Sequence, residues 1–425
     1  MSTPPSEVPD TSRQVQRTYL LLTLLTTLAA SFIWGVNTLF LLDAGLNNTE
    51  AFAANAFFSV GMVLFEVPTG VIADTRGRRF SFMLGAATLL VSTLQYLLMW
   101  SIQAPFIGWA LASILLGLGF TFFSGATEAW LVDALTATGF KGNLDTIFGR
   151  AQTVGGAAML TGSVLGGIVA QATSLGVPFI LRAIMLGVAL VFAFYFMRDL
   201  GFKPKTGVGT VAAVKDVARG SIDGGLKNRP VRWLMLAAPF TGGVGFYAFY
   251  AMQPYLLELY GDPNAYSVAG IAAAIVAGAQ IVGGLSVPIV RRFFNFRTSA
   301  ILLGVAINSI ILLGIGFTDS FWIALGLLTV WALTFAIVGP IRQAFLNGEI
   351  ASEQRATVLS FDSLMGSVGG MVTQPVLGRV ADVSGYSASY LVSAVISAGA
   401  LPFVFLAKRE HAKSDPITEQ APEPS

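Results

Sequence analysis

Long apolar runs separated by short polar turns make up most of this 425-residue chain. A helix needs about 20 mostly apolar residues to cross a bilayer, and runs of this length recur along the sequence. They predict spans near residues 19–42, 51–73, 80–100, 106–132, 147–172 and 177–197, then 231–255, 266–290, 298–317, 320–346, 356–380 and 386–407. The pattern therefore predicts an all-α membrane protein with twelve transmembrane helices in two groups of six.

The polar segments divide the chain into five parts. We expect an N-terminal tail (1–18), a first six-helix bundle (19–198), a middle loop (199–230), a second bundle (231–407) and a C-terminal tail (408–425). The first span is too long for the apolar region of a signal peptide, so it should be retained. In the middle loop, apolar residues from Val211 to Leu226 recur at helical spacing among basic ones. That loop is either an amphipathic helix on the membrane surface or a solvated tether.

Composition narrows the function classes. The chain is 54% hydrophobic and 11% charged, whereas a soluble protein carries about 25% charged residues. The net charge of +2 gives no reason to expect nucleic acid. There is no cysteine, and the one histidine, His411, lies beside the C-terminal tail. We therefore expect no disulfide, metal site or cofactor, and no enzymatic activity, because no Ser–His pair or Cys nucleophile is available.

The basic residues predict the orientation. Of the 25 Lys and Arg, only Arg182, Arg342 and Arg379 fall outside the segments that lie on one side when twelve spans are counted. Positive residues accumulate on the cytoplasmic side of membrane proteins. The chain should therefore cross a plasma (inner) membrane with both termini in the cytoplasm.

The two halves show a weak internal repeat. Gly125-x-x-Glu128 with Asp133 corresponds to Gly339-x-x-Arg342 with Asn347 at a constant spacing. Six-plus-six parallel repeats place a substrate path on the axis between the halves, near the middle of the bilayer.

A charged turn joins the second and third spans. It reads Gly70-Val-Ile-Ala-Asp74-Thr-Arg-Gly77-Arg78-Arg79. Glycine permits a tight turn and close backbone approach. The pattern Gly-x-x-x-Asp-x-x-Gly-Arg-Arg in this loop, within a twelve-span frame, resembles the major facilitator superfamily.

The resemblance implies a role for this turn as a latch at the inner ends of the two halves in the outward-open state. It implies that Asp74 faces the start of the eleventh span near Arg355, where free helix amides favour an anion. It also implies that Arg78 pairs with Asp133. A simpler alternative is that the arginines only orient the chain by the positive-inside rule.

Two further stretches resemble bacterial drug–proton antiporters. Gly162-Ser163-Val-Leu-Gly166-Gly167 is similar to the Gly-Pro-x-x-Gly-Gly antiporter motif, with Ser163 in place of proline. The pairing of Glu66-Val-Pro-Thr-Gly70 with Arg355-Ala-Thr also resembles that group. Alternatively, the glycines of the fifth span serve only close helix packing.

Ionisable residues inside the spans need a reason, because each costs about 2.5–3.5 kcal/mol at the helix centre on insertion scales. We expect Glu66, Glu128 and Asp362 to gather around Arg342, with Glu128 and Arg342 as the central ion pair. Glu66 and Asp362 are then the proton carriers, since no span contains histidine. Alternatively, these charges form inner-gate pairs that stabilise one state. Arg182 either binds an anionic group or extends to the outer interface.

The first and seventh spans are expected to contact the substrate. Aromatic rings with a few amides suit an amphipathic organic molecule. The candidates are Trp34, Asn37, Tyr247, Tyr250 and Gln253, with Trp130 of the fourth span as a stacking surface for a cation.

These observations predict a secondary active transporter, with proton-coupled efflux (antiport) of amphipathic, multidrug-type compounds by alternating access. Its partners would be a small-molecule substrate, protons and the lipid bilayer, and it would act as a monomer. One alternative is a proton symporter or facilitator for a small polar metabolite. Another is a membrane receptor or scaffold that transports nothing.

Overall fold

The computed structural model describes residues 10–204, 215, 219, 221–351 and 354–417. The first half contains eight helical segments. They are α1 (Asp10–Ser31), α2 (Asn37–Asp43), α3 (Asn48–Arg76), α4 (Arg78–Ser101), α5 (Phe106–Thr121), α6 (Ala126–Ala137), α7 (Leu144–Ala172) and α8 (Gly176–Phe196).

The second half begins after a π-helical turn, η1 (Ser221–Leu226). Its segments are α10 (Arg229–Tyr260), α11 (Tyr266–Val290), the 3₁₀ turn η2 (Arg291–Phe293), α12 (Arg297–Phe317), α13 (Phe321–Glu349), α14 (Arg355–Ala398) and α15 (Leu401–Arg409). Most of the amphipathic helix expected in the middle loop falls outside the described residues.

In the described part of the chain, ten helical stretches are long and apolar enough to cross a membrane. The last of them, Thr357–Arg409, is two crossings, because the chain turns at Gly385, whose φ of 82° is left-handed. One more crossing is made by α1 and α2, which are interrupted between Ser31 and Asn37. The prediction of twelve transmembrane helices is thus confirmed.

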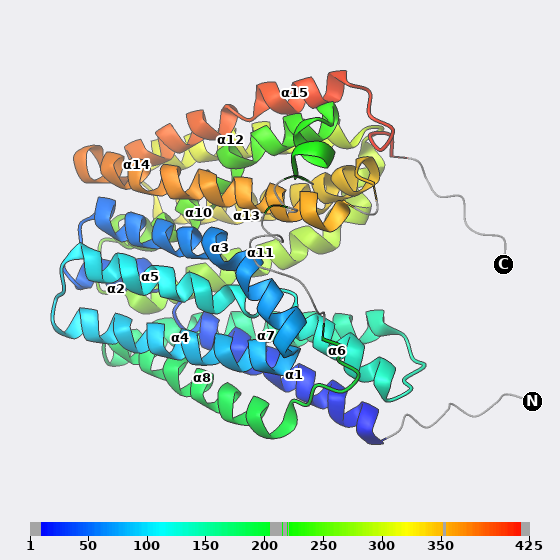
Figure 1. Cartoon of the computed structure of the whole chain (residues 1–425). Coiled ribbons are helices and arrows are strands. Elements are labelled where there is room, and N and C mark those ends of the chain that lie inside the picture. The colour runs from blue at the N-terminus through cyan, green and yellow to red at the C-terminus, as the bar shows by residue number, and fades with distance from the viewer. Residues whose placement is uncertain (1–9, 205–214, 216–218, 220, 352–353, 418–425) are drawn as a thin grey trace, which may run out of the picture.

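The helices form two bundles that lie side by side (Figure 1). Between the bundles, α3 packs along α14 and α7 packs along α11. We call the end at which α1 begins and α15 ends the terminal end, and the opposite end, where α14 turns at Gly385, the distal end; in Figure 1 these are right and left. The predicted boundaries shift slightly, since α1 begins at Asp10 and the described chain continues past α15 to Ile417.

The bundles are held together at the distal end. The carboxylate of Asp382 on α14 accepts hydrogen bonds from the backbone N–H groups of Asn48 and Thr49, both at 2.9 Å, at the start of α3. The Thr49 hydroxyl donates to the same carboxylate at 2.5 Å, and the Tyr386 hydroxyl donates to the Asn48 side chain. An acid at the amino end of a helix also meets its favourable dipole.

Toward the terminal end, α7 and α11 diverge. Near the middle of the interface, a methyl group on Gly156 would lie 3.3 Å from Ile281. Two turns further on α7, a methyl on Gly149 would meet nothing within 4 Å. One turn further on α11, Leu285 on the same stripe is 74% exposed. The structure is therefore closed at the distal end and open between these helices at the terminal end.

The glycine-rich run of α7 serves close packing on two sides. A Cβ on Gly162 or Gly166 would collide with Ser31 or the backbone of Phe32 in the first crossing. A Cβ on Gly167 would lie 2.8 Å from Cα of Gly270 on α11, in the other bundle. Small residues allow helix backbones to approach in this way within a membrane.

Candidate functional site: a cavity between the two bundles

The interior contains two adjoining cavities on the side of the second half. The larger, about 480 Å³, lies between α10, α12, α13 and α14 and includes Arg342 and Asp362 in its lining. The second, about 350 Å³, has an aromatic wall and reaches the first half at Trp34. Both are lined by Trp331 and Phe335, so together they form one path from the second half to the interface between the bundles.

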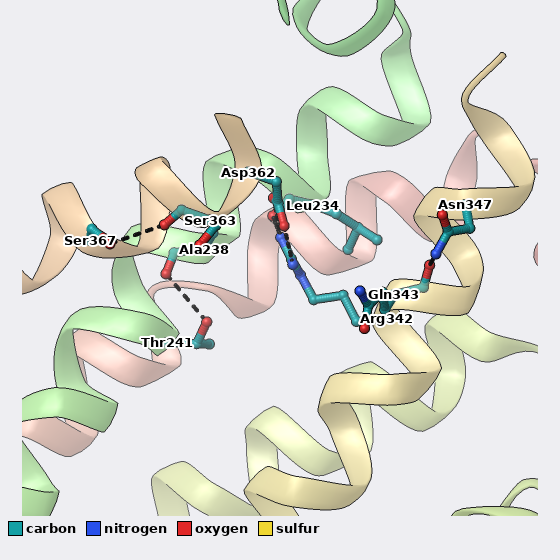
Figure 2. A network of polar contacts seen from close by, with 9 residues as sticks. All are labelled: Leu234, Ala238, Thr241, Arg342, Gln343, Asn347, Asp362, Ser363 and Ser367. Atoms are coloured by element: carbon teal, nitrogen blue, oxygen red, sulfur yellow. Dashed lines mark hydrogen bonds and ion pairs between the residues drawn. The ribbon is translucent and has the colours of Figure 1, made fainter. Parts of the chain in front are cut away.

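An ion pair forms the polar centre of the larger cavity (Figure 2). The Arg342 guanidinium on α13 donates to both carboxylate oxygens of Asp362 on α14, at 2.5 and 2.6 Å. A third hydrogen bond runs to the Leu234 carbonyl on α10 at 3.0 Å. Bidentate arginine–carboxylate pairs are among the strongest polar contacts in proteins.

The structure therefore differs from the expected pairing of Glu128 with Arg342. Arg342 and Asp362 belong to neighbouring helices of the same half, and the carboxylate occupies both terminal nitrogens of the guanidinium. Glu128 lies on α6 in the other half and is exposed. Asp362, which we expected to carry a proton, is thus the acid that pairs with Arg342 in this conformation.

The fourth crossing is interrupted where it meets Glu66. Helix α5 ends at Thr121 and α6 begins at Ala126, with Gly125 at a left-handed φ of 66°. In the break, the Ser124 hydroxyl donates to the Glu66 carboxylate on α3 at 2.8 Å. Glu66 is half-buried and Gly70, one turn on, is exposed with open space beside it. Glu66 therefore has a neutral partner and lies half-buried beside the break in the fourth crossing.

The first crossing is also interrupted, and a glutamine of the other half fills the gap. The Gln253 side chain on α10 donates to the Trp34 carbonyl at 2.8 Å and accepts from the Thr38 N–H at 2.8 Å. Backbone groups freed by a helix break inside a membrane need such partners. Gln253, 1% exposed, thus ties the halves together rather than lining the cavity.

The other predicted substrate contacts divide into two sets. Trp34 and Tyr250 line the aromatic cavity together with Phe246 and Phe249. Asn37 is buried and donates to Asn55 at 3.0 Å.

Two predicted aromatic contacts lie elsewhere. Tyr247 is buried with its hydroxyl donating to Ser389 at 2.5 Å. Trp130 is buried at the terminal end and donates to the Arg198 carbonyl at 2.7 Å, so its ring does not line either cavity as the cation-stacking surface we expected.

The charged turn has one contact that differs from those the resemblance implies, the ion pair of Arg78. Arg78 pairs with Asp74 of its own half at 2.7 Å. Asp133 meets the backbone turn at Gly201, through its carbonyl. The Arg355 guanidinium donates weakly to the Ile350 carbonyl, at 3.4 Å. In this conformation, therefore, Arg78 contacts Asp74 and not Asp133.

Asp199, a residue that we did not predict, contacts the charged turn. It accepts a hydrogen bond from the Arg79 N–H at 2.8 Å, at the start of α4, and lies against Gly77, whose φ is 110°. Burial raises the pKa of the Asp199 carboxyl, while the hydrogen bond from Arg79 acts in the opposite sense. Only glycine fits this φ beside a carboxylate without strain.

The second half has its own version of this arrangement. Asp415, 3% exposed, accepts from the Thr298 N–H at 2.8 Å and from the Thr298 hydroxyl at 2.7 Å, at the start of α12. Both acids follow the last crossing of their half. The turn at Phe293–Arg297, which lacks the aspartate and glycine of the first half, is thus capped from the C-terminal segment instead.

Ser124, Asp199, Asp382 and Asp415 were absent from the predicted site. Each is a short polar residue next to a helix end, where such residues commonly cap free backbone groups. That signal is present at many turns of the sequence, so it could not single these four out.

Twelve membrane-crossing helices in two related bundles, with cavities that lead from the second bundle to the interface between them, define the architecture of a secondary transporter. The chain belongs to the Major Facilitator Superfamily, since the model of that family matches residues 19–350 and 288–424. It is 20% identical over 377 residues to an uncharacterized MFS-type transporter, MJ1560, of Methanocaldococcus jannaschii, covering 88% of this chain and 93% of the relative.

Solved transporters share the fold. The nucleoside transporter NupG aligns with a TM-score of 0.75 at 11% identity, over 94% of this chain and 99% of the other. A bacterial homolog of the human lysosomal transporter Spinster, in an inward-facing and unoccupied conformation, aligns with a TM-score of 0.70 at 17% identity, over 97% and 100%. The POT family transporter PepTSo aligns with a TM-score of 0.70 at 14% identity, over 95% and 99%.

Proposed function

We propose that this chain is a proton-coupled exporter of amphipathic small molecules that works by alternating access as a monomer in the plasma membrane. The observation that carries the proposal is the pair of carboxylates within the spans, Glu66 half-buried beside the break in the fourth crossing and Asp362 in the cavity lining. Each is expensive to keep charged within a membrane, so each has a use for a proton.

The orientation follows from the distribution of basic residues, which assigns the terminal end to the cytoplasm. The structure, closed at the distal end, is then open inward. The Spinster homolog with which it aligns is also described as inward-facing.

Coupling centres on the bond between Arg342 and Asp362. A proton on Asp362 removes its charge and turns the carboxylate into a weaker partner for the guanidinium. Arg342 then becomes available to a second acid, for which Glu128 is the candidate across the interface. The uncompensated arginine favours a rearrangement, because a buried pair that loses one charge is strongly destabilised.

Glu66 supplies the second proton site. It has only a neutral hydroxyl, that of Ser124, as its hydrogen-bonding partner among the described residues. Because Ser124 lies in the break of the fourth crossing, a change of charge at Glu66 acts directly on the segment that links α5 to α6. Discontinuous helices of this kind mark the binding region in many transporters.

A proton symporter or facilitator for a polar metabolite is the second candidate. It is favoured by the structural relatives, which include a nucleoside transporter. The two candidates differ in the direction in which a pH gradient drives the substrate.

The experiment uses inverted membrane vesicles with an acidic interior. Three fluorescent amphiphiles serve as probes: cationic ethidium, neutral N-phenyl-1-naphthylamine and anionic carboxyfluorescein. We expect gradient-driven accumulation of at least one probe, and its loss in Glu66→Gln and in Asp362→Asn. Accumulation that is independent of the gradient, or unchanged in both variants, would contradict the proposal.

Two controls make the result specific. Asp319→Asn removes an exposed acid at the distal end and should leave transport unchanged. The double variant Arg342→Gln/Asp362→Asn removes both members of the ion pair, so it separates the loss of a proton site from the damage done by an orphaned arginine.

A further inference from the structure

Arg182 is a buried arginine in the first half that the proposed mechanism does not use. It lies on α8 and is 3% exposed. Its Nε donates to the Thr93 hydroxyl on α4 at 3.1 Å, and one terminal nitrogen lies 3.5 Å from the Ala29 carbonyl on α1. The Phe120 ring lies 6.0 Å from the guanidinium carbon. All of these partners are neutral.

The contrast with Arg342 shows what is missing. Arg342 has a carboxylate on both terminal nitrogens, whereas no acidic side chain among the described residues pairs with Arg182. Neutral hydrogen bonds lower the cost of burying a guanidinium but leave its charge uncompensated. Extension to the outer interface is also excluded, because the side chain is buried.

A strictly structural role leaves part of this arrangement unexplained. The two hydrogen bonds connect α8 to α4 and α1, which a neutral donor could also do. The contact to Ala29 is at the limit of hydrogen-bonding distance, and the second terminal nitrogen donates to none of the described residues. The two terminal nitrogens are the donors that a carboxylate or sulfonate engages in parallel.

Arg182 also lines a cavity. This cavity is about 290 Å³ and lies within the first half, with Thr26, Thr27, Phe120 and Trp34 among its lining residues. Trp34 is shared with the aromatic cavity at the interface, where Phe249 and Tyr250 form the opposite wall. The Trp34 and Phe249 rings lie 5.5 Å apart. A ligand can therefore have a charged end at Arg182 and an apolar body beside these rings.

We propose that Arg182 binds the anionic group of an amphipathic substrate, a carboxylate or sulfonate, whose apolar body lies against Trp34, Phe249 and Tyr250. The ligand supplies the negative charge that no acidic side chain among the described residues supplies to Arg182. This inference rests on the proposed function in one respect, that the cavity holds a transported molecule, and it specifies the charge of that molecule.

The test measures equilibrium binding to the purified full chain in detergent, by calorimetry, with no ion gradient. The probes are 2-naphthoate, 2-naphthamide and 2-naphthylmethylammonium, which share one apolar body and differ in charge. We expect naphthoate to bind about ten- to a hundredfold more tightly than the amide, the range for a charge-assisted bond. The ammonium should bind most weakly.

Arg182→Gln should reduce naphthoate affinity to that of naphthamide while leaving naphthamide affinity unchanged, which also shows that the cavity is intact. Arg182→Lys, which keeps the charge, should retain part of the preference. Arg379→Gln is the matched control, because it removes an exposed arginine elsewhere in the spans.

No binding of naphthoate, equal affinity for acid and amide in the wild-type chain, or a preference that survives Arg182→Gln would overturn the inference. The comparison of probes on the wild-type chain decides the matter even if Arg182→Gln fails to fold. Binding without a gradient is independent of proton coupling, so failure of this inference and failure of the proposed efflux are separate outcomes.

Discussion

At each end of the α3–α14 pair, an acidic residue on one helix is matched with the amino end of the other helix. The two ends differ in which helix carries the acid. At the distal end, Asp382 of α14 lies on the amino end of α3 and accepts from the N–H groups of Asn48 and Thr49. At the terminal end, Asp74 of α3 has the amino end of α14, near Arg355, as its predicted partner. Each end thus has an acid on one helix and a helix amino end on the other.

The difference lies in how the acids are used. Asp382 bridges the two halves by hydrogen bonds, while the contacts of Asp74 include an ion pair with Arg78 of its own half at 2.7 Å. If one latch holds each end, the two should alternate: the distal latch stabilises the state described here, and the terminal latch stabilises the opposite one. Because the chain contains no cysteine, single cysteines introduced at either end can be labelled selectively.

Two cysteine substitutions report whether the distal end and the terminal end are open. Thr38→Cys replaces a buried residue at the distal closure whose hydroxyl has no hydrogen-bonding partner among the described residues. Ser363→Cys replaces an exposed residue that lines the cavity in the second half. Labelling of the first should report distal opening, and labelling of the second should report terminal opening.

The largest effect is expected for Gln253→Leu. It leaves the Trp34 carbonyl and the Thr38 N–H without partners in the closed distal end, at a cost of about 1–3 kcal/mol for each buried group. Thr38→Cys should become reactive, by at least tenfold in labelling rate. Gln171→Leu is the control, because its bond to the Ser267 N–H is long, at 3.4 Å, and exposed. Protection of Thr38→Cys in the Gln253→Leu background would disprove the bridging role.

Asp382→Asn should have the next largest effect. It removes the charge from hydrogen bonds to a helix amino end, which are worth about 1.5–3 kcal/mol when one partner is charged. We expect more labelling at Thr38→Cys and less at Ser363→Cys, since the population moves away from the state closed at the distal end. Asp319→Asn, at the same end, should change neither rate. A change at one reporter alone would show that the two ends do not alternate.

Asp74→Asn should have the smallest effect and the opposite sign. The Asp74 side chain is 25% exposed, and partly exposed ion pairs are worth about 0–1 kcal/mol. Weakening the terminal latch should raise labelling at Ser363→Cys a few-fold and lower it at Thr38→Cys. Asp145→Asn, an exposed acid at the start of α7, serves as control. If Asp74→Asn shifts labelling in the same direction as Asp382→Asn, the proposed exchange between latches is wrong.

Much of the fold could be predicted from the sequence, because the length of apolar runs and the placement of basic residues are local properties. Twelve crossings and two bundles follow from them directly. The interruptions at Trp34 and Ser124 do not, since a glycine such as Gly35 or Gly125 within an apolar run is also compatible with an unbroken helix.

The site was less predictable because pairing depends on distances across the fold. Glu128 and Asp362 were both candidates for pairing with Arg342. Their spacing along the chain does not show whether Arg342 pairs with an acid of its own half or with one of the other half. The burial of Arg182 could likewise not be predicted from the sequence, because its distance from the end of an apolar run is equally compatible with extension of the side chain to the membrane surface.

The position of Asp415 has a consequence for how the protein is made. Asp199, which caps α4, is synthesised directly after the last crossing of the first half, so that half can complete its capping while the second is still being translated. Asp415 follows Thr298 by 117 residues, after α13, α14 and α15. The amino end of α12 must therefore wait until the three crossings that follow it have been synthesised before its cap exists. Assembly of the second bundle is thus completed late, and the first bundle is available as a template before then.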